Sequence, residues 1–130
     1  MTSVSAETSE ATELSISPGP LVGPVLRRVV GMLAARADLP LDRLDDAVIV
    51  ADVIADRAGP YALDAIQVRF EPGERTLWMR IGPLTTGGAQ ALLSEARDVG
   101  PIIVKLADEV QIDTSQADVE FLRVCLAYDG

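Results

Sequence analysis

Histidine is absent from the chain, and only one cysteine occurs among its 130 residues. Without histidine, the Ser-His-Asp and Cys-His pairs of many hydrolases and all histidine metal sites are excluded. Cys125 cannot form an internal disulfide, and no apolar run reaches the roughly 18 residues of a membrane-spanning helix. The first residues have neither a basic start nor an apolar signal core, so we expect a cytoplasmic protein without a membrane contact.

Basic residues are also scarce. Eleven lysines and arginines face twenty aspartates and glutamates, which gives a net charge of −9 and a pI near 4.3. This excess would repel a phosphate backbone, so we expect no direct binding to nucleic acid. Hydrophobic residues, in contrast, make up 48% of the chain, which is the composition of a folded globule. Its length fits a single domain.

The first residues differ in composition from the rest. They are rich in Ser, Thr, Ala and Glu, and they show no basic residue and no lasting apolar period. We therefore expect residues 1–15 to be a flexible acidic tail and residues 16–130 to form the domain. The alternation at residues 13–17 leaves a short edge strand open as an alternative.

Two helices are expected after this tail. From Leu21, apolar residues recur every three or four positions, and the helix should end before Pro40, because proline disfavours a helical residue before it. The second helix, residues 41–58, has a broad apolar face and a second patch at 49, 50 and 53 nearly opposite. We expect this helix to be packed on two sides.

An acidic stripe runs between these two apolar patches of the second helix. Asp45, Asp52 and Asp56 are spaced by seven and four residues, so their carboxylates project in nearly one direction. Like charges four residues apart cost only a few tenths of a kcal/mol on a surface helix. The stripe therefore fits either a solvated edge or the remnant of a ligand site.

The second half of the chain predicts strands with short helices between them. Residues 66–70 and 77–81 alternate around an expected type II turn at 71–74 with Pro72 and Gly73 at its centre. Thr85 or Thr86 is the expected N-cap of a short helix. Further elements are expected as a helix at 101–109 and strands at 110–112 and 119–128. This order predicts an α/β fold of the α+β type, a two-layer sandwich with helices on one face of a mixed, mostly antiparallel sheet.

The stretch from residue 16 to residue 128 resembles the ATP-binding domain of anti-sigma-factor serine kinases, within the gyrase/Hsp90/histidine-kinase superfamily. Residues 44–56 are similar to the family's nucleotide helix and residues 77–81 to its central strand. Residues 100–110, with Leu106-Ala107-Asp108, resemble its late helix. The resemblance implies an ATPase-like domain, a nucleotide site at the second helix, and partner or dimer contacts around the early strand and first helix.

The chain departs from the family at the nucleotide site. Where the family has Glu and, four residues later, the Mg²⁺-binding Asn, this chain has Asp52 and Asp56, and the Asp that reads adenine is missing. The resemblance leaves Asp52, Asp56, Gly82, Gly87 and Gly100 as a vestigial nucleotide site without catalytic residues. The second carboxylate would add negative charge beside a triphosphate.

The resulting hypothesis is a regulatory binding module resembling an anti-sigma factor, which acts in transcriptional or stress signalling without a cofactor or metal. Its partner would be a sigma factor or an anti-sigma antagonist, with a homodimer as a second option. The partner-binding candidates are Arg27 and Arg28, the only adjacent basic pair, and Trp78, since tryptophan is favoured at interface hot spots. Solvated arginines and a packed tryptophan are the plainer interpretation. The alternatives are an active ATP- and Mg²⁺-dependent anti-sigma serine/threonine kinase, or a scaffold subunit for one.

Overall fold

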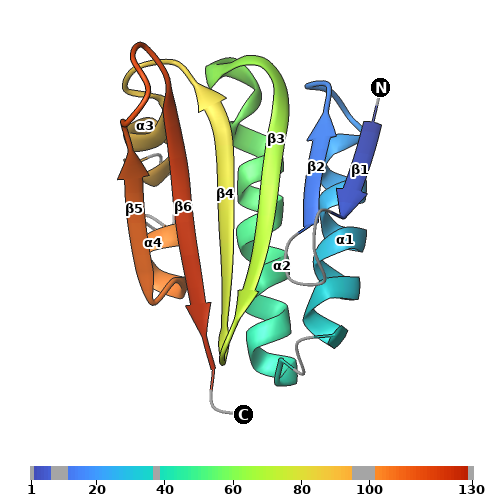
Figure 1. Ribbon diagram of the computed structural model, residues 1–130. Coiled ribbons are helices and arrows are strands. Elements are labelled where there is room, and N and C mark those ends of the chain that lie inside the picture. The colour runs from blue at the N-terminus through green and yellow to red at the C-terminus, as the bar shows by residue number, and fades with distance from the viewer. Residues whose placement is uncertain (1, 7–11, 37–38, 95–101, 129–130) are drawn as a thin grey trace.

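The computed structural model describes residues 2–6, 12–36, 39–94 and 102–128. One antiparallel sheet of six strands has the order β1-β2-β3-β4-β6-β5, and the helices cover one of its faces (Figure 1). The strands are β1 (Thr2–Ala6), β2 (Thr12–Ile16), β3 (Ala62–Gly73), β4 (Thr76–Leu84), β5 (Glu109–Asp113) and β6 (Glu120–Ala127). The helices are α1 (Val22–Arg36), α2 (Leu41–Arg57), α3 (Gly88–Ser94) and α4 (Ile102–Leu106), with the 3-10 turn η1 (Gly59–Tyr61). The α+β sandwich predicted from the sequence is confirmed, and all five strand pairs are antiparallel.

The core lies between the sheet and the helices. Alternate residues of each central strand point into it, because successive side chains of a strand face opposite sides. Fully buried strand residues include Ile66, Val68, Phe70, Leu77, Met79, Ile81, Leu122, Val124 and Leu126. Each such side chain contributes about 1.5–3 kcal/mol when it is removed from water. The strands expected at 66–70, 77–81 and 119–128 thus share one sheet, and the second helix is packed on it.

Helices α1 and α2 form an antiparallel pair on this core. A Cβ placed on Gly23 would lie 3.7 Å from Cβ of Ala55, so the two helices approach closely at these small residues. Ala47, Ala51 and Ile54 of α2 are buried, which confirms the broad apolar face, and Val50 of the second expected patch is buried with them. The second expected patch is only partly covered, since Ile49 is 42% exposed.

The expectation of a flexible tail is wrong for residues 2–6 and 12–15. They belong to β1 and β2, which pair with each other, and β2 also pairs with β3. Strand β2 is therefore internal to the sheet and not at its edge. Leu14 and Ile16 face the core with 0% and 1% exposure, and their burial explains why this polar segment is held in place.

The hairpin turn also differs from the expectation. Strand β3 continues through Pro72, which pairs with Leu77, and the turn residues are Glu74 and Arg75. Arg75 has a φ of +58°, in the left-handed region that tight turns use. The observed register places Phe70 opposite Met79, whereas the expected turn would have placed Phe70 opposite the charged Arg75. Apolar cross-strand pairing therefore outweighs the Pro-Gly turn signal.

The remaining elements agree with the sequence in type. The helix α4 and the strands β5 and β6 lie where they were expected, although α4 is short. The cap of α3 differs from the expected threonine cap. Oε1 of Glu120 accepts a hydrogen bond from N of Ala89 in the first turn of the helix at 3.2 Å. None of the helices in the described ranges combines the length and hydropathy needed to cross a membrane.

Candidate functional site

Asp52, the first residue of the expected vestigial site, is held by α1. Its Oδ1 accepts hydrogen bonds from Nη2 of Arg27 at 2.8 Å and from Nε at 3.1 Å. The two side chains are 41% and 60% exposed, so the ion pair contributes at most about 1 kcal/mol to stability. One expected nucleotide residue and one expected partner residue thus bind each other on the outer surface of the α1–α2 pair.

Asp56 lies beside this ion pair at a shallow depression of about 390 Å³. The depression lies between the turn before α1 and the C-terminal half of α2, and its lining residues are Gly19, Pro20, Gly23, Arg27, Asp52, Ala55 and Asp56. Gly82 and Gly87 are not among them. The carboxylates and the described glycines of the expected nucleotide site therefore do not meet in one pocket.

Gly82 has a packing role within the sheet. A Cβ at this position would lie 2.5 Å from Cδ2 of Phe121 and 2.9 Å from the carbonyl oxygen of Glu120. The ring of Phe121 thus lies against the glycine of the neighbouring strand, a common reason for glycine inside a strand. Gly87 has a φ of +85° in the turn before α3, and Gly100 lies outside the described residues.

The Leu106-Ala107-Asp108 segment takes part in a structural clamp. Arg43 of α2 donates hydrogen bonds to Asp46 at 2.7 Å, to the carbonyl of Ala127 at 2.8 Å and to the carboxylate of Asp108. The same Asp108 carboxylate accepts from N of Ala127 at 2.7 Å. These contacts fix the start of α2 to the end of β6. They give Asp108 a structural role that requires no bound ligand.

The outer face of the sheet, opposite the helices, carries two aromatic rings, and an arginine guanidinium lies over each of them. The guanidinium carbon of Arg123 lies 4.5 Å from the ring centroid of Trp78, and that of Arg80 lies 3.7 Å from the ring centroid of Phe121. Such cation–π contacts contribute about 0.5–1 kcal/mol each at exposed sites. Trp78 is therefore a half-buried member of a layer in which arginines cover the rings.

Cys125 lies on the same face and is 5% exposed. Burial raises the pKa of its thiol, and the negative charges of Asp108 and Glu109 raise it further. A raised pKa keeps the thiol protonated at neutral pH and a poor nucleophile. Cys125 is therefore a packed thiol.

The expected site residues thus lie on separate parts of the molecule. Arg27, Asp52 and Asp56 share the α1–α2 surface, and Arg28 is exposed on α1. Trp78 belongs to the outer face of the sheet. No group of three or more cysteine, aspartate or glutamate side chains within the described residues is placed to hold a metal ion.

Sequence reasoning missed that Arg123 covers Trp78 and that Arg80 covers Phe121. Arg80 and Arg123 stand at alternate strand positions, so alternation alone places them on the outer face. Which of them are neighbours depends on strand order and register, which the sequence does not display.

Comparison with models of known protein families gives no match to this chain, and comparison with curated protein sequences gives none either.

Proposed function

We propose that the chain is a non-catalytic protein-binding module in transcriptional or stress signalling, of the kind that an anti-sigma factor with a decayed nucleotide site would form. The observation that carries the proposal is an apolar flank of α1, which is exposed. Leu21, just before the helix, is 64% exposed, and Met32 is 56% exposed. Between them Val25 and Val29 recur at helical spacing and are half-buried. We call these four residues the α1 flank.

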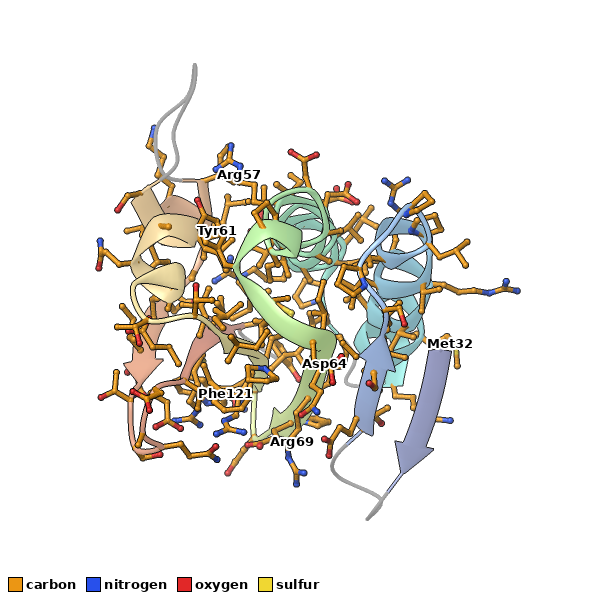
Figure 2. The ribbon with its side chains drawn as sticks, turned by 90° about the horizontal axis from the view of Figure 1, so that it is seen from above. Met32, Arg57, Tyr61, Asp64, Arg69 and Phe121 are labelled. Carbon is orange, nitrogen blue, oxygen red and sulfur yellow. The ribbon has the colours of Figure 1, made fainter. Side chains whose placement is uncertain are left out.

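The α1 flank lies beside the edge of the sheet. Among the strands of the described residues, β1 pairs with β2 alone, and Met32 projects from α1 on the side of the molecule where β1 lies (Figure 2). Grouped exposed apolar residues of this kind are typical of protein interaction surfaces, whereas isolated ones need no explanation. The exposed Arg28 lies on the same helix and supplies a charged rim.

The pairing of Asp52 supports the non-catalytic part of the proposal. A base or metal ligand for phosphoryl transfer needs its carboxylate directed at the phosphates. In this chain Arg27 already engages the carboxylate of Asp52, while the described glycines of the expected site serve packing and turns. An unpaired second carboxylate, Asp56, would repel a triphosphate. We therefore expect any affinity for ATP to be no tighter than about 1 mM, roughly −4 kcal/mol.

The partner we propose is a sigma factor or an anti-sigma antagonist, and a second copy of the chain is the other option. A net charge of −9 would steer a basic partner toward the chain, so association should weaken as salt rises. The test is light scattering and calorimetry with the purified sigma factors and antagonists encoded beside the chain's own gene. Binding should weaken at least tenfold in Met32→Asp. It should be unchanged in Ile49→Asp, a matched exposed residue of α2.

Three results would speak against this function. One is a chain that stays monomeric and binds none of these proteins. Another is an equal loss of binding in Met32→Asp and Ile49→Asp, which would show that the α1 flank is not the specific binding surface. The third is micromolar affinity for ATP with Mg²⁺ together with phosphoryl transfer to serine, which would favour the active kinase over the binding module.

A further inference from the structure

Helix α1 differs in charge from the rest of the chain. It carries Arg27, Arg28 and Arg36 and no acidic residue, whereas the whole chain has twenty acidic and eleven basic residues. The neighbouring helix α2 carries five aspartates. A basic helix therefore lies at the surface of an acidic molecule.

Two of these arginines have no partner. Arg27 is bound by Asp52 on the side of α2. Arg28 and Arg36 are exposed, and neither side chain forms a hydrogen bond or an ion pair with any of the described residues. The arginines on the outer face of the sheet differ in this respect, since Arg80, for example, is held by a carboxylate. The donors of Arg28 and Arg36 are thus left for an acceptor from outside the chain.

The two free arginines stand on either side of Met32. Four residues of a helix advance by about 6 Å and rotate by about 40°, so Arg28, Met32 and Arg36 form a line about 12 Å long on one face of α1. Met32 is 56% exposed and projects from the helix (Figure 2). The other residues of the α1 flank continue this apolar centre toward Leu21. An exposed apolar side chain therefore lies between two unpaired cations.

We propose that this line binds a helix of a partner protein in which an apolar side chain stands between two carboxylates about eight residues apart. The inference rests on the proposed function, because it assigns the chemistry of the partner segment that contacts the α1 flank. Two helices packed side by side have the same rise per residue, so each carboxylate meets an arginine while the apolar residue covers Met32. Charged residues that border an apolar seam select partners in coiled coils in the same way.

The net charge of the chain is compatible with this contact. Exposed charges are screened over about 8 Å at physiological ionic strength. The charge of −9 therefore acts on the partner as a whole during its approach, whereas the pairs formed on contact depend on Arg28 and Arg36. Both effects weaken as salt rises, so an exchange of charges at the contact is needed to separate them.

Other occupants fit this line less well. Anionic membranes are bound by clusters of about 4–8 basic residues, and a nucleic acid gains affinity with each phosphate that a cation neutralises. Two arginines on a chain with a net charge of −9 supply little of either. Neither occupant explains the exposed Met32 at the centre of the line.

A second copy of the chain is the nearest competitor. Its α2 presents Ile49, which is 42% exposed, between Asp45 and Asp52. However, Asp52 is already bound by Arg27 within each chain. A contact of α1 with the α2 of another copy is also head-to-tail, so it leaves a free surface at each end and continues into larger assemblies. Self-association is therefore an outcome that the experiment must separate.

The test uses the full chain and a fluorescein-labelled, alanine-rich helical peptide of about 20 residues, because shorter isolated helices are marginal in water. The peptide has Glu at positions i and i+8 and Leu at i+4, and anisotropy measures its binding at low and at physiological salt. We expect saturable binding. Arg28→Gln/Arg36→Gln should bind at least tenfold more weakly, and each single variant should lose part of the affinity. Arg75→Gln, the same charge change at an exposed arginine of the β3–β4 turn, should bind as the natural chain does.

A charge exchange then tests the contact itself. Arg28→Glu/Arg36→Glu should lose the Glu peptide and bind a peptide with Lys at the same two positions, which the natural chain should not bind. A third peptide has the two Glu residues on the face opposite to Leu. It keeps the net charge and should bind the natural chain at least tenfold more weakly. Circular dichroism checks the fold of every variant.

Several results would overturn the proposal. These are no binding of the Glu peptide at about 1 mM, an equal loss of affinity in Arg75→Gln and the double variant, and equal binding of the peptide with displaced Glu residues. Tighter binding of oligo(dT) or of anionic vesicles would replace the partner helix by a polyanion. Self-association of the natural chain that Arg28→Gln/Arg36→Gln abolishes would replace it by a second copy.

The outcome for this inference is separable from that for the proposed function. A sigma factor or antagonist whose binding falls in Met32→Asp but not in Arg28→Gln/Arg36→Gln would keep the proposed function and reject the inference. Binding of the Glu peptide through the two arginines, with no binding of any sigma factor or antagonist, would support the inference and reject the proposed function.

Discussion

Replacing Leu14 by alanine tests whether the polar segment at residues 12–16 belongs to the folded core. Leu14 is 0% exposed and pairs with Val68 of β3. The substitution removes three buried carbon atoms, which costs about 2.4 kcal/mol at roughly 0.8 kcal/mol for each. The cavity that remains adds to this, and measured losses for such changes in other proteins are about 2–5 kcal/mol. We therefore expect Leu14→Ala to lower the free energy of unfolding by at least about 2 kcal/mol.

Urea denaturation followed by Trp78 fluorescence and by circular dichroism measures this change. At a slope of about 1–3 kcal/mol per M, the midpoint should fall by roughly 1–2 M. Leu63→Ala is the matched control, because Leu63 lies on β3 but is 50% exposed. A loss in Leu14→Ala below about 0.5 kcal/mol, the size of ordinary surface changes, would show that β2 contributes nothing to the core.

Two further predictions concern the outer face of the sheet. Gly82→Ala should destabilise the fold by about 1–3 kcal/mol, because the added Cβ would meet Phe121 at 2.5 Å, and thermal unfolding of the variant checks this. Hydrogen bonds from Ser115, and then from Arg80, lower the pKa of Asp113 to about 2. A lowered pKa stabilises the fold above the ordinary carboxyl pKa near 4, and this contribution is lost as the pH falls toward 2. The melting temperature of Asp113→Asn should therefore depend less on pH between 4 and 2 than that of the natural chain, and parallel curves would contradict this.

Long periodic segments were predictable from the sequence. The helix α2 was recovered almost to the residue, because its apolar positions repeat over more than four turns and Gly59 and Pro60 follow its end. The hairpin strands were recovered for the same kind of reason, since Ile66, Val68 and Phe70 alternate strictly. In each case the burial pattern repeats within the segment itself, so no knowledge of distant partners was needed.

Segments that fold because of their neighbours were mispredicted. Residues 12–16 contain only two apolar side chains, Leu14 and Ile16, so their alternation left a short edge strand only as an alternative to the flexible tail. Their burial depends on the pairing of β2 with β3, which begins only at residue 62. The turn of the hairpin failed similarly, because Pro72 and Gly73 are a strong local signal that the pairing of Phe70 with Met79 overrides.

The candidate surfaces follow the same division between local and long-range information. Trp78 was singled out by residue type, yet its environment depends on Arg123, which lies 45 positions away along the chain and enters through the pairing of β4 with β6. Arg69, Arg80 and Arg123 likewise lie side by side only because two registers coincide, that of β3 with β4 and that of β4 with β6. A shift of one residue in β6 would turn Arg123 toward the core, and the cost of burying that charge unpaired protects the observed register. A surface of this kind becomes visible only when strand order and register are known.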